Sequence, residues 1–488
     1  MAPSGGVRTL TSDKSSRLGR SGPLPLRSPR MPGDFTVLIM AAGRGTRMRS
    51  PLPKVLHPVC GKPMVEWVID AAREAGAGEV ICITRPGDGV AEGLPESVTV
   101  AEQRQGEGTG AAILAAREAG PAEGTVLVLS GDHPLLCAEL IGRLVDTHGR
   151  ERAAATLLTT EELDPAGYGR VMRAADGSVE RIVETKYTEG LSAEELAARE
   201  VNIGTYAFEA SDLWSALDEV GEEREEIYLT GVFPVLRDRG DRVVSNLTTD
   251  VSGAMGVNTR ADLMEVDRLA ARRILDRHAR AGVTFLGPDS TRIEAGVTVG
   301  ADTTVWPGVT LRGATSIGAG CEIGPQTTIT DSALGERVKA LHSFVCEATV
   351  ESGASLGPFA YLRPGAHIGE GAKIGTFVEV KNSSVGPGAK VPHLSYLGDA
   401  DVGANSNIGA GNITANYDGR RKHRTTIGDG VKTGVDTSFV APVSVGDGAY
   451  TGAGSVIGED VPDGALGVSR SKQVNVEGYA ERKEKPPG

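Results

Sequence analysis

The sequence is poor in aromatic residues and contains no closely spaced pair of cysteines. Phe, Trp and Tyr make up 4% of its 488 residues. The five cysteines, at positions 60, 82, 137, 321 and 346, include no C-x-x-C spacing, which excludes a zinc ribbon and argues against a disulfide scaffold. A reducing cytoplasm is therefore the expected location.

The chain also lacks long apolar runs and basic tracts. No apolar stretch approaches the roughly 20 residues that a membrane helix needs. Lys and Arg number 51 against 64 Asp and Glu, which gives a formal net charge of −13. An acidic chain without a basic tract binds nucleic acid poorly. We therefore expect neither a membrane nor a nucleic acid among its partners.

Glycine, by contrast, is abundant. The 66 glycines, the 40% hydrophobic fraction and the few aromatics together are typical of repetitive β structure with many tight turns. At roughly 100–200 residues per domain, the length predicts two to four domains. Residues 1–34 are rich in Ser, Arg, Pro and Gly and lack the apolar stretch of a signal peptide, so we expect a disordered extension there.

Residues 35–258 alternate short apolar runs with helical patterns. The clearest strands are 37–40, 80–83 and 126–129, and the clearest helices are 65–75 and 111–119. Such alternation predicts an α/β domain with a Rossmann-like, mostly parallel sheet. Ligands of such sheets bind beyond the carboxyl ends of the strands.

A linker helix is predicted within 259–282. Leu263, Val266, Leu269 and Ile274 fall near one face of a helix over 259–280, and Gly282 follows as a stop. The helix is expected to join two domains.

From residue 283 the apolar residues recur at every sixth position. The unbroken series is Ile293, Val299, Val305, Leu311, Ile317, Ile323 and Ile329, and two further registers start at Val350 and Ile427. This period predicts an all-β domain of hexapeptide repeats, a β-helix, over 283–470. The register breaks near Leu334, Val385 and 412–425, and the longest break is expected to carry function. The charged tail, 471–488, is expected to be flexible.

The segment M-A-A-G-R-G-T-R-M, residues 40–48, directly follows the first predicted strand. Glycine and small residues let backbone N–H groups approach a phosphate or a base edge closely. The segment is neither G-x-G-x-x-G nor a Walker motif, so alone it is modest evidence for nucleotide binding. Arg47 and Lys54 place positive charge beside it, although an ordinary solvated lysine is the alternative for Lys54.

Asp132 closes the third predicted strand, in the segment L-S-G-D-H-P. A carboxylate at a strand end after glycine suits a hard metal ion. The alternative is that Asp132 caps the following helix.

Ordered motifs then carry a resemblance. L-I-M-A-A-G-R-G-T-R-M followed by L-P-K and G-K-P-M resembles the signature of sugar-nucleotide pyrophosphorylases. In the repeat region come L-R-P-G-A at 362–366, F-V-E-V-K at 377–381, H-L-S-Y-L-G-D-A at 393–400, N-I-G-A-G at 407–411 and A-N-Y-D-G at 415–419. From Phe35 to Arg470 the chain resembles the family of bacterial bifunctional N-acetylglucosamine-1-phosphate uridyltransferases / glucosamine-1-phosphate N-acetyltransferases.

The resemblance implies two reactions. A left-handed parallel β-helix, assembled as a homotrimer, acetylates glucosamine 1-phosphate with acetyl-CoA. The N-terminal domain transfers UMP from UTP to the product and releases pyrophosphate, which supplies UDP-N-acetylglucosamine for peptidoglycan and other cell-wall precursors. The implied metal is Mg²⁺ or Mn²⁺, held by Asp132 and Asn258; one carboxylate and one amide suit Mg²⁺ and do not suit Zn²⁺.

The resemblance also implies the residues of the uridyl site. Arg47 and Lys54 are the catalytic cations. The expected substrate-binding residues are Met40, Ala41, Ala42, Gly43, Lys54, Gln103, Gly108, Thr109, Ser130, Gly131, Asp132, Gly169, Glu184, Asn202 and Asn258. Gln103, Gly108 and Thr109 would read the base. Gly169, Glu184 and Asn202 would hold the N-acetylglucosamine moiety.

In the acetyl site, His393 is the candidate base, since imidazole titrates near neutral pH and the sugar amine must lose a proton. Without the motif, a structural role would be the better interpretation of a histidine in such a coil. Arg363 and Lys381 would meet the sugar phosphate, although exposed charge at a β-helix corner is their alternative. The other expected residues are Tyr396, Asn407, Asn416 and Tyr417 for the sugar, and Ala410, Lys422, Val435, Ala453 and Arg470 for acetyl-CoA.

The chain departs from the family pattern at four positions. Ala111 replaces a His, Gly106 stands where some members have Gln, Ile203 replaces a Thr, and Val435 replaces a Ser that would contact acetyl-CoA. Two alternatives remain: a pyrophosphorylase of other sugar specificity with a purely oligomerising β-helix, or a non-catalytic regulatory subunit. The first fits poorly with His393, Asn416 and Tyr417, for which a purely structural β-helix has no use. The second predicts losses at Lys54, Asp132, Asn258 or His393, and all four are present.

Overall fold

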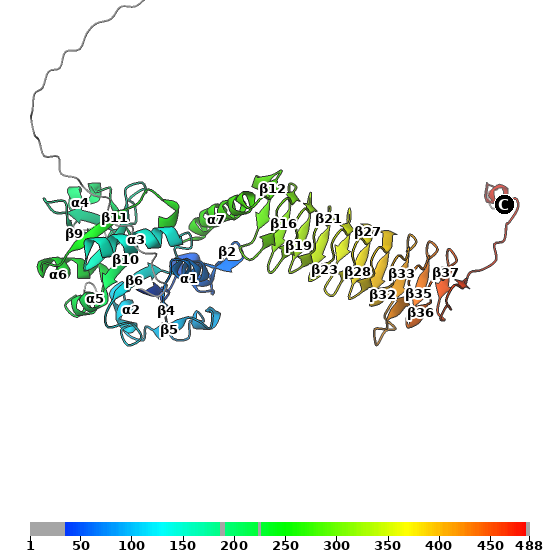
Figure 1. Cartoon of the computed structure of the whole chain (residues 1–488), viewed down its shortest axis with the longest axis horizontal. Coiled ribbons are helices and arrows are strands. Elements are labelled where there is room, and N and C mark those ends of the chain that lie inside the picture. The colour runs from blue at the N-terminus through cyan, green and yellow to red at the C-terminus, as the bar shows by residue number, and fades with distance from the viewer. Residues whose placement is uncertain (1–34, 186–190, 223–225, 485–488) are drawn as a thin grey trace, which may run out of the picture.

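The computed structural model describes residues 35–185, 191–222 and 226–484. The extension predicted at 1–34 lies outside the described residues. An α/β domain stands at one end of the elongated molecule, and a β-helix forms the rest (Figure 1). Helix α7 (Arg260–Arg280) lies between them.

The α/β domain is built on one sheet with the strand order β11-β7-β10-β6-β1-β4-β5. Along that order the strands are Val243–Leu247, Ala155–Thr160, Val201–Glu209, Thr125–Ser130, Phe35–Met40, Glu79–Thr84 and Thr99–Glu102. Strand β10 is antiparallel to both neighbours, whereas the β6, β1, β4 and β5 pairings are parallel. A hairpin of β8 (Arg170–Arg173) and β9 (Val179–Val183) branches from β10. The predicted mostly parallel sheet is confirmed.

Helices cover both faces of this sheet, which explains its nearly continuous apolar strands. Helices α1 (Met64–Glu74) and α3 (Ala138–Glu151) contribute to one apolar cluster. Helices α2 (Thr109–Ala115), α5 (Ala210–Leu217) and α6 (Val232–Asp238) contribute to the cluster on the opposite face. A short helix, α4 (Ala193–Ala197), begins with a capping box between Ser192 and Glu195.

The linker helix begins and ends close to its predicted limits. Thr259 caps α7, accepting a hydrogen bond from the backbone N–H of Asp262 while the Asp262 carboxylate accepts one in return. Val266 and Ile274 are fully buried, and Gly282 follows the helix with φ +96°. A small hairpin of β2 (Pro58–Val59) and β3 (Lys62–Pro63) packs beside the helix.

The C-terminal body stacks short strands into three parallel sheets. The first sheet comprises β12 (Thr284–Phe285), β15 (Thr304–Val305), β18 (Glu322–Ile323), β21 (Lys339–Ala340), β24 (Ser355–Leu356), β27 (Lys373–Thr376) and β30 (Lys390–His393). The pair β37 (Tyr450–Thr451) and β39 (Leu466–Gly467) lies further along the helix axis.

The second sheet comprises β13 (Arg292–Ile293), β16 (Thr310–Arg312), β19 (Thr328–Thr330), β22 (Phe344–Cys346), β25 (Tyr361–Leu362), β28 (Glu379–Lys381), β31 (Tyr396–Gly398), β33 (Ile413–Ala415), β35 (Ser438–Val440) and β38 (Val456–Ile457). The third sheet comprises β14 (Thr298–Val299), β17 (Ser316–Ile317), β20 (Ala333–Leu334), β23 (Thr349–Val350), β26 (His367–Ile368), β29 (Ser384–Val385), β32 (Ala400–Val402), β34 (Thr425–Ile427) and β36 (Val443–Val445).

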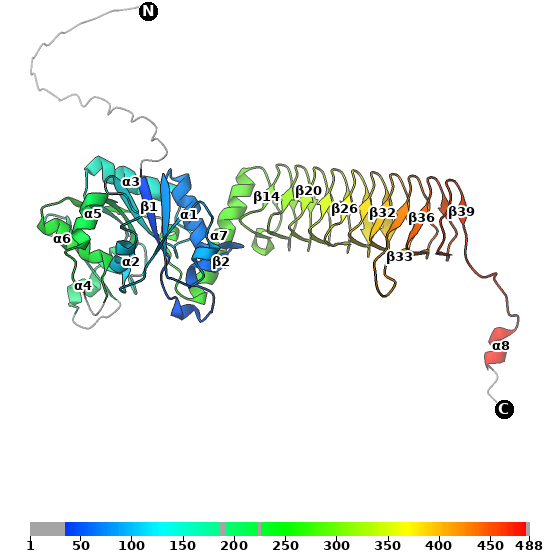
Figure 2. The ribbon, with the colours of Figure 1, turned by 90° about the horizontal axis from the view of Figure 1, so that it is seen from below.

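The six-residue period therefore marks the residue that each strand turns into the core of the coil. Leu311, Ile323, Leu362, Val380 and Phe439 have no exposed surface. The predicted left-handed β-helix of hexapeptide repeats is confirmed as the fold class. The longest predicted break is a loop between β33 and β34 that projects from the coil, closed by a Tyr417–Lys422 bridge (Figure 2).

All five cysteines are free. Within the described residues, none of the helices has the length and apolar character to cross a membrane. The last helix, α8 (Tyr479–Glu484), lies on the tail beyond the coil.

Candidate active sites

Four side chains converge at the carboxyl edge of the α/β sheet. Lys54 begins the short 3₁₀ helix η2 (Lys54–Leu56), and its ammonium pairs with the Asp132 carboxylate. The same ammonium donates to Asn258 Oδ1 at 3.2 Å, and Arg47 Nη2 donates to that oxygen at 2.9 Å. Asp132 follows β6, and its carbonyl accepts from the Val257 N–H at 3.0 Å, which fixes the segment carrying Asn258.

Local backbone geometry makes this convergence possible. Gly45 has φ +56°, and a Cβ at this position would lie 2.7 Å from the Lys54 Cβ. A side chain there would therefore push Lys54 away from the Gly-rich turn. The turn itself continues from β1, with the Ala41 N–H bonded to the Ile83 carbonyl at 2.9 Å.

The charge pair is largely shielded from water. The Lys54 and Asp132 side chains are 12% and 17% exposed. Burial alone would raise the pKa of Asp132, but the charge and hydrogen bond of Lys54, together with the neighbouring His133, lower that pKa. Lys54 is thus not an ordinary solvated lysine. Asp132 does not cap the next helix either, because α3 begins at Ala138 with Cys137 at its N-cap.

The donor set suits a hard cation. Asp132 and Asn258 present one carboxylate and one amide oxygen around a single point, where the Lys54 ammonium contacts both. Among the described residues, no three His, Cys, Asp or Glu side chains gather as a metal cluster. Mg²⁺ uses few protein oxygens and completes its shell with water and substrate phosphates, so the two oxygens fit it.

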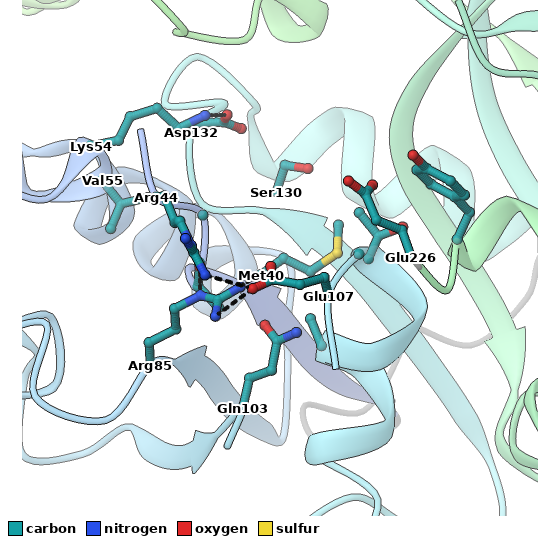
Figure 3. A pocket seen from close by; sticks show the side chains of 16 residues that line it. Met40, Arg44, Lys54, Val55, Arg85, Gln103, Glu107, Ser130, Asp132 and Glu226 are labelled. Carbon is teal, nitrogen blue, oxygen red and sulfur yellow. Dashed lines mark hydrogen bonds and ion pairs between the residues drawn. The ribbon is translucent and has the colours of Figure 1, made fainter. Parts of the chain in front are cut away.

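A cavity of about 320 Å³ opens on one side of this cluster (Figure 3). Its walls include the predicted residues Met40, Ala42, Gly43, Lys54, Gln103, Gly108, Thr109, Ser130 and Asp132. Gly108 has φ +96°, and a Cβ there would collide with the Ile227 carbonyl. Two predicted residues lie behind the wall instead: Ala41 is buried in the sheet core, and the Gly131 N–H bonds to the Met40 carbonyl.

A second cavity of about 500 Å³ adjoins the first and shares Met40, Thr109, Ser130 and Asp132 with it. The three residues expected to hold the sugar, Gly169, Glu184 and Asn202, all line it, as do Arg47 and Asn258. Glu184 accepts a hydrogen bond from the Thr230 hydroxyl at 3.0 Å, and Asn202 Nδ2 donates to the Tyr206 hydroxyl at 2.7 Å. The cluster around Asp132 therefore stands where the two cavities meet.

Sequence reasoning missed several polar residues of these cavities. Arg44, Arg85 and Glu107 line the first cavity, and both arginines form ion pairs with Glu107. His133, Thr230 and Asp262 line the second. Arg44 lies within the Gly-rich motif, which was a usable signal. Glu107 lies between the predicted residues Gln103 and Gly108, which was a usable signal as well. Arg85 follows β4 and belongs to no recognised pattern, so only the fold brings it to Glu107.

In the β-helix, strand register stacks part of the predicted acetyl site into a column. The pairings Lys390↔Asn407, Asn407↔Lys432 and Lys432↔Tyr450 are parallel, so the residues three positions further along also stack. Those residues are His393, Ala410, Val435 and Ala453. Arg470 Nη1 donates to the Ala453 carbonyl at 2.9 Å and adds a cation at the end of the column. His393 is exposed, so it is not a buried structural histidine.

The remaining predicted residues lie on the second sheet and the projecting loop. Arg363 pairs with Glu379 at 2.9 Å, and Lys381 lies 3.7 Å from Asp399. Asp399 also accepts from the Asn416 amide. Burial would raise the pKa of Asp399, but its hydrogen bonds and Lys381 lower it. Proximity to Lys381 lowers the pKa of Lys422, so the loop brings a second ammonium to this group.

Tyr396 completes the group on strand β31, where it pairs in register with Glu379. Asn407 lies three residues before Ala410 of the column, and Tyr417 is exposed on the projecting loop. Within one chain, Lys381 on β28 and His393 on β30 thus lie on strands close in sequence, and the other predicted residues lie on nearby coils.

Known protein families match both the α/β domain and the β-helix. Residues 37–192 match the model of the MobA-like NTP transferase domain, and residues 290–331 match that of the bacterial transferase hexapeptide (six repeats). A "Bifunctional protein GlmU" of Brevibacillus brevis is 46% identical over 91% of this chain and 97% of the relative. That of Mycobacterium bovis strain BCG is 45% identical over 93% of both, and that of Mycolicibacterium vanbaalenii 46% over 92% and 93%.

These matches extend over nearly the whole chain at well above 30% identity, in the same domain order. They confirm the resemblance drawn from the motifs, and they establish nucleotides as substrates of the N-terminal domain. The chain belongs to the bifunctional GlmU family, and it is an enzyme that joins an NTP transferase domain to a hexapeptide-repeat transferase domain.

Proposed function

We propose that the α/β domain transfers UMP from UTP to N-acetylglucosamine 1-phosphate and releases pyrophosphate. The observation that carries this proposal is the position of Lys54, Asp132 and Asn258 where two cavities meet. A nucleotide in the first cavity and a sugar phosphate in the second would bring their phosphates to that point. Phosphoryl transfer of this kind needs alignment and neutralisation of charge more than covalent help from the protein.

Each residue then has a defined task. A phosphate oxygen of the sugar 1-phosphate attacks the α-phosphorus of UTP, and pyrophosphate leaves with the electrons of the broken P–O bond. Arg47 and Lys54 supply fixed positive charge beside the phosphates. Mg²⁺ or Mn²⁺, held by Asp132 and Asn258, would supply further neutralisation of the triphosphate. Gln103 and Thr109 orient the base, and Glu184 and Asn202 orient the sugar.

We propose that the β-helix acetylates glucosamine 1-phosphate. His393 takes a proton from the sugar ammonium, the free amine attacks the thioester carbonyl of acetyl-CoA, and CoA leaves as the thiol. Arg363 and Lys381 bind the sugar phosphate, and Tyr396, Asn407, Asn416 and Tyr417 bind the sugar. Ala410, Val435 and Ala453 leave room along the column for the pantetheine arm, with Lys422 and Arg470 as cations for the CoA phosphates.

We propose that this half works as a homotrimer. Phe359, Phe377 and Leu394 stack in one exposed column, 53%, 58% and 61% exposed, with the two phenyl rings 5.3 Å apart. An apolar ridge of this kind favours association with another copy of the chain. The ridge runs directly beside His393, so a neighbouring copy seated on it would close over the acetyl site.

The proposed functional limits follow the same division: residues 35–258 carry uridyl transfer, 259–282 form the linker, 283–470 carry acetyl transfer, and the charged tail begins at residue 471. A cytoplasmic location is proposed because nucleotide and CoA substrates are supplied there. The two alternatives are less well supported. A purely oligomerising β-helix would have no use for the His393 column, and a regulatory subunit would have no use for a shielded Lys54–Asp132 pair.

The test follows free thiol and pyrophosphate separately, with glucosamine 1-phosphate, acetyl-CoA, UTP and Mg²⁺. His393→Ala and Asp132→Asn are assayed in parallel, with each site given its own substrate. We expect each variant to lose one product by about 100-fold or more and to keep the other. Pyrophosphate without thiol release by the unmodified chain would support the oligomerising β-helix, and neither product would support the regulatory subunit.

A further inference from the structure

Arg85 and Glu107 form a link across the nucleotide cavity that no motif predicts. Arg85 Nη2 donates to Glu107 Oε2 at 2.6 Å, and Nη1 lies 3.4 Å from Oε1. Arg44 Nη2 donates to the same Oε1 at 2.7 Å. Figure 3 shows the three side chains meeting beside Met40 and Gln103. One carboxylate thus receives two guanidinium groups from different loops.

The Arg85 guanidinium also contacts the Gly-rich turn. Its Nε donates to the Ala42 carbonyl at 2.7 Å. Arg85 directly follows β4, which lies in the sheet between β1, the strand before that turn, and β5, the strand before the Gln103–Thr109 loop. A single planar group therefore joins the two loops that carry the proposed nucleotide contacts.

The Gln103–Thr109 loop is fixed at its other side as well. The Glu107 carbonyl accepts from the Ile227 N–H at 2.9 Å, and the Ile227 carbonyl accepts from the Gly110 N–H at 2.7 Å. Gln103 Nε2 donates to the Gly106 carbonyl at 3.1 Å. Because backbone hydrogen bonds to Ile227 hold one side of the Gln103–Thr109 loop, the contact through Arg85 sets the distance between this loop and the Gly-rich turn.

The Arg85–Glu107 ion pair contributes more to the position of the loop than to the stability of the fold. The Arg85 and Glu107 side chains are 25% and 45% exposed, and partly exposed ion pairs contribute little to folding. The hydrogen bond from Arg85 lowers the pKa of Glu107, so the carboxylate stays charged at neutral pH. We infer that Arg85, through Glu107 and Ala42, is a positioning residue that sets the spacing of the nucleotide cavity and thereby the affinity for UTP. This inference rests on the proposed uridyl site.

The test measures both activities of the full chain in each variant. Arg85→Ala is expected to raise the KM for UTP about tenfold while kcat changes less than about twofold. The KM for N-acetylglucosamine 1-phosphate and the acetyl-transfer rate should not change. Discrimination between UTP and CTP should fall, since Gln103 is held by the same loop. Arg85→Lys keeps the charge but not the planar fork, and an intermediate KM is expected.

Glu107→Ala should raise the KM for UTP as Arg85→Ala does, and the double variant should be no worse than either single one, because both remove the same link. Arg104→Ala is the matched control: this arginine lies on the same loop but pairs outward with Glu102. Additive losses, an unchanged KM in Arg85→Ala, or equal effects of Arg104→Ala would overturn the inference. Absence of uridyl transfer in the unmodified chain would instead refute the proposed function.

Discussion

At the scale of single residues, we expect the charge of Lys54 to be essential to the proposed uridyl site. Its ammonium is shielded from water, so its attraction for phosphate is stronger than that of a surface lysine. Lys54→Met should lower kcat for uridyl transfer by about 100-fold or more, by analogy with the loss of one charge-stabilising donor. Steady-state kinetics with UTP and N-acetylglucosamine 1-phosphate measure this.

Lys62→Met is the matched control, because Lys62 lies in the same motif region yet pairs with the more exposed Asp70. It should leave uridyl transfer near the level of the unmodified chain. Equal losses in the two variants would mean that Lys54 acts through local folding and not through charge at the phosphates.

Some residues of the candidate uridyl site could be predicted from the sequence, and others could not. The family resemblance names Lys54, Asp132 and Asn258 together, so their convergence could be anticipated. The link between Arg85 and Glu107 could not, since charged residues after strands are common and only the strand order β1-β4-β5 brings these two together. Ala41 and Gly131 belong to motifs, yet their place behind the cavity wall depends on the path of the backbone.

At the scale of elements, the junction around α7 joins three parts of the chain. Asp267 on α7 pairs with Arg292 of the first coil at 2.6 Å and accepts from the Cys60 N–H at 2.8 Å. Burial raises the pKa of the Cys60 thiol to about 12, so this cysteine packs as an apolar residue. The hairpin, the helix and the β-helix are thus held by one carboxylate.

Asp267→Asn should lower the stability of this junction by about 1–2 kcal/mol at neutral pH, since Asn keeps the bond to Cys60 and loses the charge that Arg292 needs. Burial would raise the pKa of Asp267, but hydrogen bonds from Arg292 and Cys60 lower it. Because the pKa of Asp267 is lower in the folded than in the unfolded chain, its charge stabilises the folded chain fully at pH values above the unfolded-state pKa of about 3.9. This stabilisation is lost as the pH falls through the lower folded-state pKa.

Calorimetric unfolding of the unmodified chain and of Asp267→Asn at several pH values measures this. The difference in transition temperature should be largest above about pH 5 and should shrink below about pH 4. Arg268→Gln serves as the control, because Arg268 pairs with Glu265 on the exposed face of the same helix. A difference that persists unchanged at acid pH would contradict the assigned role of the charge.

Elements also differ in how well the sequence predicts them. The β-helix could be predicted closely because a buried aliphatic residue recurs every six residues, once for each strand of the coil. Helix α2 was harder: the alanine-rich pattern predicted 111–119, but the helix is Thr109–Ala115. Beyond Ala115 the next backbone N–H groups bond to the carbonyl three residues earlier instead of four. The Arg117 guanidinium there donates to the Asp218 carboxylate and to the Trp214 carbonyl of α5. Tertiary contact there overrides intrinsic helix propensity.

At the scale of the whole molecule, the two sites lie far apart. The α/β domain stands at one end, whereas the projecting loop after β33 lies well along the coil (Figure 1). A change in assembly should therefore affect the two reactions differently. The ridge of Phe359, Phe377 and Leu394 lies in the β-helix, where Leu394 directly follows His393. We therefore expect acetyl transfer, and not uridyl transfer, to depend on a second copy of the chain that covers the ridge.

Phe377→Asp places a charge in the middle of that ridge, where burial against another copy would leave it unpaired. We expect sedimentation equilibrium at micromolar concentration to show trimers for the unmodified chain and mainly monomers for the variant. Acetyl transfer should fall at least about tenfold and recover in part as protein concentration rises, because association is governed by mass action. Thr349→Asp, a new charge on the exposed face of the third sheet, should leave both assembly and activity unchanged. Trimers that persist in Phe377→Asp, or uridyl transfer that falls in parallel with acetyl transfer, would show that the ridge does not carry the assembly on which the acetyl site depends.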